Sequence, residues 1–153
     1  MRIVIQRVKY ASVTVDGKIT GKIDSGIMAL IGFKEGDEER LLKPMAEKMT
    51  GLRIFEDEDE KMNLSLGDVG GEILAISQFT LYADCKKGKR PSFIDALKPD
   101  KANEFYEKFV KICDDLTGKK TQTGIFGADM KVELLNDGPV TIILDSDEIV
   151  KKP

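Results

Sequence analysis

The sequence predicts an α+β fold, in which a mostly antiparallel, barrel-like sheet carries two main helices. Strand-like runs and hairpin signals dominate the chain, and only two segments show helical periodicity. The length of 153 residues leaves room for one domain and one core. A doubly wound parallel sheet would instead alternate strands with many helices. The run Gly124-Ile125-Phe126-Gly127 also lacks the residue order of a P-loop or a dinucleotide-binding loop.

The first third of the chain is expected to form strands. Residues 3–5 are apolar, residues 12–15 alternate polar and apolar side chains, and Asp16-Gly17 is a two-residue hairpin signal before a strand at 18–23. The run at 26–33 is apolar on both faces, so it predicts a central strand buried on both sides.

The first helix is predicted over 37–51, where Leu41, Met45 and Met49 recur at every fourth position. Pro44 either kinks this helix or marks a later start, with its ring in the first turn. A short strand at 52–55 should follow. The acidic run at 56–60 then predicts a solvated loop tip, because it lacks the glycine and the terminal glutamate spacing of a calcium loop.

The second half should contain a strand at 72–79, a basic loop at 85–92 and the clearest helix, at 99–116. This helix places an apolar stripe on one face and ends before Gly118; the stripe comprises Ala102, Phe105, Tyr106, Phe109, Cys113 and Leu116. Strands at 130–134 and 140–144 come last, separated by a turn at 136–139. We expect one domain over 1–144 and a charged C-terminal tail over 145–153.

Composition excludes several kinds of chemistry. The chain has no histidine, so a Ser-His-Asp triad, a Cys-His pair and histidine-ligated metal centres are impossible. Cys85 and Cys113 are too far apart for tight zinc spacing and too few for a disulfide framework. We therefore expect no metal and no cofactor. Any catalysis must proceed without imidazole.

Charge and hydropathy limit the partners. A net charge of −3 argues against coating a long duplex, so no DNA is expected, although one local basic patch could grip a nucleic acid. The longest apolar run has eight residues, whereas about 20 are needed to span a bilayer. The first seven residues are too polar for a signal peptide. These features predict a cytoplasmic protein with no membrane partner.

The first candidate site is Ser77-Gln78-Phe79-Thr80, at the end of a buried strand. Hydroxyls, an amide and main-chain N–H groups gather there, which is how an oxyanion hole can be built from the main chain. The alternative is a strand end whose hydroxyls bond nearby backbone. Thr80 could be a nucleophile, but no histidine is present to activate it.

Two further segments have both an ordinary and a functional interpretation. Asn136-Asp137-Gly138-Pro139 is first of all a turn before a strand, and the alternative is a cis Gly138–Pro139 bond. The loop at 85–92 concentrates positive charge, which is either a solvated surface or a site for phosphates; the four candidates for phosphate contact are Lys86, Lys87, Lys89 and Arg90.

Five segments together resemble the D-aminoacyl-tRNA deacylase family. Their order and spacing match over residues 1 to about 144; they are Gln6-Arg7-Val8, Ser77-Gln78-Phe79-Thr80-Leu81, Arg90-Pro91-Ser92-Phe93, Thr121-Gln122-Thr123-Gly124 and Asn136-Asp137-Gly138-Pro139-Val140-Thr141. The departures are Pro44 and the segment after Leu144, and neither affects a candidate site residue.

The resemblance implies a homodimeric, metal-independent hydrolase that acts in translation quality control. It would cleave the ester between a D-amino acid and the acceptor end of tRNA, with glycyl-tRNA as a second substrate. Gly138 and Pro139 would form a cis motif that enters the partner subunit's pocket and rejects L-amino acids. Ser77 to Thr80 would line the pocket, and main-chain groups near Phe79 would hold the oxyanion.

The resemblance also suggests two supporting roles. Arg7 would brace the partner's Gly-Pro turn, and the segment from Phe126 to Met130 would face the adenosine. Two other functional classes remain open on the residues alone. One is a threonine-nucleophile esterase acting on small esters, and the other is a non-catalytic RNA-binding module.

Overall fold

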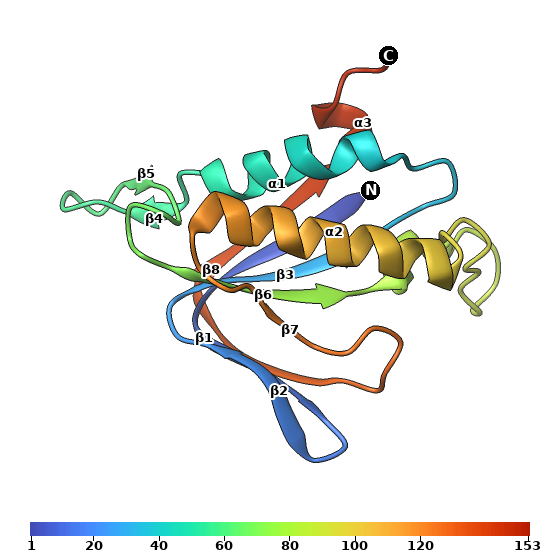
Figure 1. Ribbon diagram of the computed structural model, residues 1–153, viewed down its shortest axis with the longest axis horizontal. Coiled ribbons are helices and arrows are strands. Elements are labelled where there is room, and N and C mark those ends of the chain that lie inside the picture. Colours follow the sequence, from blue (N-terminus) through green and yellow to red (C-terminus); the bar gives the residue numbers. More distant parts are fainter.

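The computed structural model describes residues 1–153 and contains a curved mixed sheet with helices packed on one face (Figure 1). The strands are β1 (Arg2–Val15), β2 (Lys18–Ile23), β3 (Gly26–Gly32), β4 (Phe55–Glu56), β5 (Met62–Leu64), β6 (Glu72–Ser77), β7 (Gln122–Thr123) and β8 (Lys131–Asp145). The helices are α1 (Leu42–Gly51), α2 (Pro99–Thr117) and α3 (Ser146–Ile149), with two 3₁₀ helices, η1 (Glu39–Leu41) and η2 (Phe79–Tyr82).

The main sheet is centred on β1 and has the order β2-β1-β3-β6-β7, with β8 also paired to β1. All pairs made by β1 are antiparallel, whereas β3–β6 and β6–β7 are parallel. The expected α+β, barrel-like architecture with two main helices is confirmed, and the sheet is mixed. The two parallel pairs arise because the connection from β3 to β6 crosses the helical face through α1 and the connection from β6 to β7 crosses it through α2 (Figure 1).

β1 and β8 are each one long strand, where the sequence suggested shorter pieces. Both halves of β8 pair with β1 in the same direction and form one continuous strand, so the turn predicted at 136–139 is wrong. Gln6 pairs with Thr141 and Val8 with Asn136, which leaves Arg7 alone opposite residues 137–140. Turn-forming residues here make a bulge, because β1 is long enough to hold the strand on both sides of it.

The helices match their expected positions with one refinement. The region predicted as the first helix opens with η1, and α1 starts at Leu42, so Pro44 lies in its first turn. There the missing N–H of proline has no intrahelical acceptor to lose. α2 ends before Gly118, which adopts φ +69° as a left-handed cap. The acidic run forms the tip between β4 and β5, as expected for a solvated loop.

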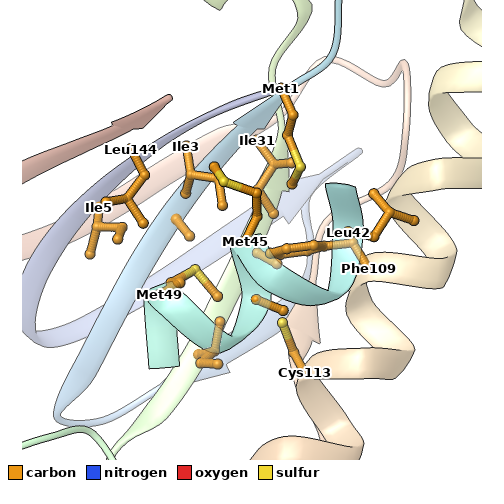
Figure 2. Close-up of a cluster of buried hydrophobic side chains, with 14 of the residues drawn as sticks. Met1, Ile3, Ile5, Ile31, Leu42, Met45, Met49, Phe109, Cys113 and Leu144 are labelled. Carbon is orange, nitrogen blue, oxygen red and sulfur yellow. The ribbon is translucent and has the colours of Figure 1, made fainter. Parts of the chain in front are cut away.

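The larger core lies between the sheet and the helices. Figure 2 shows Met45 and Met49 of α1 between the sheet residues Ile3 and Ile5 and the α2 residues Phe109 and Cys113. A second, smaller cluster fills the opposite, concave face of the sheet. Since Ile27 and Ile31 belong to the first cluster and Met28 to the second, β3 is buried on both faces as predicted.

The C-terminal segment is more structured than the expected tail. β8 continues to Asp145, and α3 follows with Ser146 buried and its N–H donating to the Met1 carbonyl. Within this segment only the last three residues are both exposed and free of secondary structure. None of the helices combines the length and apolar character needed to cross a membrane.

Candidate active site

The segment predicted as catalytic lies where β6 ends. β6 stops at Ser77, two residues earlier than expected, and the Gln78 N–H donates to the Ile31 carbonyl of β3 at 2.8 Å. The chain then turns into η2. The first N–H groups of a 3₁₀ helix have no acceptor inside it, so the N–H groups of Phe79 and Thr80 are free of intrahelical bonds.

A pocket of about 600 Å³ opens beside η2. Ser77, Gln78 and Phe79 form one wall, and the segment from Phe126 to Met130 forms another. The start of α2 completes the lining at Pro99. Most of the wall is apolar and Phe79 of η2 belongs to it, which suits a small organic group with a polar reacting centre. The structure thus brings together five of the residues singled out in the sequence.

Thr80 does not belong to the pocket wall. Its side chain is exposed, and its hydroxyl oxygen accepts a hydrogen bond from the Gln78 amide Nε2 at 2.6 Å. The bond fixes the Gln78 side chain across the first turn of η2. This geometry gives the hydroxyl a structural partner and no general base.

Two glycines allow the segments of the pocket wall to pack closely. Neither glycine was predicted from the sequence to have this role. A Cβ at Gly32 would lie 2.8 Å from the Gln78 carbonyl oxygen and 3.0 Å from the Leu81 Cβ, so η2 rests directly on the end of β3. A Cβ at Gly124 would collide with the Met130 sulfur. For Gly32, the only sequence signal was its position near the end of the apolar run at 26–33.

Two aromatic residues of the pocket lining, Phe79 and Phe93, connect it to the basic loop, because Phe93 directly follows Ser92 in the chain. Phe79 and Phe93 meet edge to face, with ring centroids 5.1 Å apart. Reciprocal main-chain hydrogen bonds between Asp84 and Ser92 close the base of the loop. Its four cationic side chains are exposed and make no ion pair within the chain; they are Lys86, Lys87, Lys89 and Arg90. Unpaired cations beside a pocket mouth can contact phosphates.

Gly138 and Pro139 lie outside the pocket of their own chain and are exposed. Their peptide bond is cis, as the second interpretation of the sequence had it. Arg7 binds the residue that directly precedes Gly138. Its Nε donates to the Asp137 carbonyl at 3.1 Å and its Nη1 to the Ile54 carbonyl at 2.7 Å.

The environment of Arg7 is unusual for an arginine. Its side chain is only 6% exposed, and two carboxylates share its charge: Asp137 at 3.5 Å and Glu56 at 3.7 Å. A buried guanidinium with carbonyl and carboxylate partners is a rigid support. Within one chain Arg7 therefore braces its own Gly-Pro segment, and contact with a partner's segment stays a prediction.

No group of three or more cysteine, aspartate or glutamate side chains is placed to hold a metal ion. Of the two cysteines, Cys85 is exposed in the basic loop and Cys113 is buried in the core. Burial raises the pKa of the Cys113 thiol to about 12. Cys113 is thus a packing residue, as its helical position predicted.

Comparison with known proteins gives consistent matches over nearly the whole chain. A family model described as D-Tyr-tRNA(Tyr) deacylase matches residues 4–145. A D-aminoacyl-tRNA deacylase of Clostridium tetani is 54% identical over 149 residues, covering 97% of this chain and 99% of the relative. One from Fusobacterium nucleatum is 60% identical over 146 residues, covering 95% and 96%.

Two solved structures share the fold. A c-Myc DNA unwinding element binding protein superposes with a TM-score of 0.88 at 40% identity, covering 95% of this chain and 98% of the other. A probable eukaryotic D-amino acid tRNA deacylase superposes with a TM-score of 0.82 at 17% identity, covering 94% and 97%. At 17% identity the second match shows only that the fold is shared.

Proposed function

This chain belongs to the D-Tyr-tRNA(Tyr) deacylase family, and from that premise we propose that it hydrolyses the ester bond of D-aminoacyl-tRNA. Water adds to the ester carbonyl, the bond to the terminal ribose oxygen breaks, and a free D-amino acid and tRNA leave. One observation carries the proposal: the start of η2, where the first N–H groups have no intrahelical acceptor, contributes Phe79 to the lining of a mostly apolar pocket, and Phe79 packs against Phe93 at the end of the basic loop. The cytoplasm, where tRNA is charged, is the proposed location.

Transition-state stabilisation is assigned to the main chain near Phe79. Attack on the ester carbonyl places negative charge on its oxygen, and fixed N–H donors stabilise that charge without reorganising. No imidazole exists to take a proton, so the ribose 2′-hydroxyl beside the ester is the available polar group. An aminoacyl ester is already activated, and positioning with an oxyanion hole suffices. Metal ions and cofactors have no part in this scheme.

Selection of D-amino acids is assigned to Gly138 and Pro139 of a second subunit. These residues are exposed, lie outside their own pocket and rest on the buried Arg7, so they form a firm projecting element. Inserted into the partner's pocket, they would leave room for a D-side chain and collide with an L-side chain. Selection by exclusion accepts many D-residues and also glycine, which brings glycyl-tRNA into the substrate range.

A homodimer is proposed on related grounds. β8 is 15 residues long and pairs only with β1, so its other edge has unpaired main-chain groups. Leu135 and Ile143 on this strand are 48% and 64% exposed. An isologous contact along this face would bury the apolar side chains of both subunits.

The two rival classes fit the geometry less well. A threonine-nucleophile esterase needs Thr80 in the pocket, and its hydroxyl lies outside the wall and accepts from Gln78. A non-catalytic RNA-binding module would use the basic loop but leaves the pocket unexplained. The acidic net charge does not favour duplex DNA as a partner.

Hydrolysis of four matched substrates tests the proposal. We expect release of amino acid from a D-aminoacyl-tRNA, far slower release from its L-counterpart and from a free D-amino-acid ester, and measurable release from glycyl-tRNA. EDTA should leave the rate unchanged, and excess duplex DNA should not compete. Rapid hydrolysis of the free ester would favour the small-ester esterase, and binding of tRNA without turnover would favour the RNA-binding module.

A further inference from the structure

Arg2 connects three parts of the fold that are distant in sequence. Its position in β1 pairs with Gly32 at the end of β3 on one side and with Asp145 at the end of β8 on the other. Its Nη1 donates to the Leu81 carbonyl in η2 at 2.8 Å. The side chain thus reaches from the start of β1 to the segment that contributes to the pocket wall.

Asp145 orients the guanidinium of Arg2. Both Nε and Nη2 donate to the Oδ2 of Asp145, at 3.2 and 3.1 Å, while the other carboxylate oxygen accepts the Asp147 N–H at the start of α3. Asp145 is 17% exposed and Arg2 36% exposed, so this pair is partly shielded from water. A guanidinium with three of its donors engaged has little rotational freedom.

Tyr82 supplies the remaining contact. The Arg2 Cζ lies 4.7 Å from the centre of the Tyr82 ring, and this ring is buried at the end of η2. The hydroxyl of Tyr82 is itself buried without a hydrogen-bond partner, so the ring is held by packing and by the cation above it. Arg2 therefore contacts the last two residues of η2 through different chemistry.

We propose that Arg2 is a positioning residue for the reaction, which holds η2 against the end of β3 through Leu81 and Tyr82. η2 is fixed at its start by the bond from the Gln78 N–H to Ile31 and at its end by Arg2. Gly32 lets the two segments touch, so no side chain lies between them to set their spacing. The main-chain donors near Phe79 lie between these two anchors.

This inference rests on the proposed function, because it assigns the donors of η2 to the reacting carbonyl. A small displacement of such donors affects the transition state more than substrate binding, which uses the apolar walls and the basic loop. Loss of Arg2 should therefore lower kcat and leave KM nearly unchanged. A residue needed only for stability would not produce that split.

The test compares Arg2→Met, which removes the donors and keeps the approximate length, with Arg2→Lys, which keeps the positive charge but lacks the planar fork of donors. Arg40→Met is the matched control, since Arg40 is an exposed arginine bonded to Glu38 and the Lys151 carbonyl and outside the pocket. We expect kcat for D-aminoacyl-tRNA to fall about tenfold in Arg2→Met, in line with misplaced oxyanion donors, and less in Arg2→Lys. KM should differ from the wild-type value by no more than about twofold, which is much less than a tenfold change in binding.

Hydrogen exchange of the Leu81 and Ala83 amides, which donate to the Gln78 and Thr80 carbonyls, gives a second readout that does not depend on activity. The proposal is supported if exchange becomes faster in this segment alone in Arg2→Met and if exchange in Arg40→Met is the same as in the wild type. Wild-type-like exchange or kcat in Arg2→Met overturns the inference, as does an exchange increase spread evenly over the chain. If the wild-type protein hydrolyses no D-aminoacyl-tRNA, the proposed function fails, and the exchange result still decides whether Arg2 anchors η2.

Discussion

A side chain at position 138 would be crowded by its neighbours. Gly138 adopts φ +126°, and a Cβ there would lie 3.0 Å from the Val140 Cγ2 and 3.1 Å from the Arg7 Nη2. We expect Gly138→Ala to displace the segment from Arg7 and to cost about 1–3 kcal/mol of stability, the range for strained backbone. Thermal unfolding and D-aminoacyl-tRNA hydrolysis should both decline.

Gly36→Ala is the matched control for that change. Gly36 also has a positive φ, +88°, but a Cβ at this position would have no atom within 4 Å of it. The variant should share the backbone strain and keep the activity. Equal activity in the two variants would show that the space around Gly138 has no functional meaning.

The Thr80 hydroxyl should be dispensable. It accepts from Gln78 and lies outside the pocket, so Thr80→Val removes one exposed hydrogen bond and leaves the main-chain donors in place. Single-turnover hydrolysis should retain activity within about fivefold, because an exposed bond contributes about 1 kcal/mol or less. Mass spectrometry that traps an acyl group on Thr80 would contradict this prediction.

Single residues show how far sequence reasoning reaches. Ser77, Gln78 and Phe79 were predicted to meet at a strand end, and they do, because alternation and the break in apolar pattern are local signals. The carbonyl partners of Arg7 could not be predicted. Ile54 is 47 positions away, and its carbonyl carries no side-chain signature.

Among the elements, the basic loop leads to a test of phosphate binding. Its four cations have no ion pairs within the chain, and the loop base is fixed by the Asp84–Ser92 bridge. Replacing Lys86 and Lys87 with glutamine should weaken binding of all tRNAs alike. For every phosphate that a replaced lysine no longer neutralises, the slope of log K against log salt should become shallower by about one.

Lys18→Gln with Lys22→Gln provides the control for the loop variant. Both lysines belong to β2, are exposed and form no salt bridge with the rest of the chain. They carry the same total charge change but lie outside the pocket lining. The salt slope could stay unchanged in the loop variant, or it could become shallower by the same amount in the control. Either result would show that the loop is an ordinary solvated surface.

α2 leads to a prediction for alkaline pH. Burial raises the pKa of Cys113 to about 12 and also raises the pKa of Tyr106, whose hydroxyl donates to the Ala75 carbonyl. Both groups are neutral in the fold. Above pH 9 the unfolded chain loses the Cys113 proton while the folded chain keeps it, so stability falls as pH rises toward 12.

The expected slope is about 1.4 kcal/mol per pH unit for each such group. Urea unfolding between pH 8 and 11 measures it. Cys113→Ala should be less stable at every pH but show a shallower slope, whereas Cys85→Ala should keep the wild-type slope because Cys85 is exposed. If Cys113→Ala had the same slope as the wild type, the Cys113 thiol would not contribute to the pH dependence.

Strand lengths show where local pattern fails at the level of elements. Residues 6–11 were not assigned to a strand from the sequence. The four turn-forming residues from Asn136 divided β8 into two predicted strands. Each strand is held by pairing with the other on both sides of the bulge at 137–140. Long-range pairing overrides local propensity, and a single sequence does not contain that information.

At the scale of the molecule, the pocket and the Gly-Pro segment belong to different parts of one chain. Gly138 and Pro139 do not line the pocket of their own chain, so the proposed site is complete only when a second chain supplies them. We expect activity per chain to fall on dilution below the dimer dissociation constant, while circular dichroism remains that of the folded protein. Unchanged activity in a folded monomer would exclude a site shared between subunits.

Complementation between two variants of reduced activity tests the sharing directly. Gly138→Ala has an intact pocket, and Ala128→Trp blocks the pocket, which Ala128 lines, but leaves Gly138 and Pro139 intact. In a mixture that has exchanged subunits, about half of the dimers are mixed and each has one complete site, if pairing in two-fold dimers is random. Activity should rise to about a quarter of the wild-type value, because one site in four is complete. If each chain used its own Gly-Pro segment, every site would retain one defect, and the mixture would be no more active than its parts.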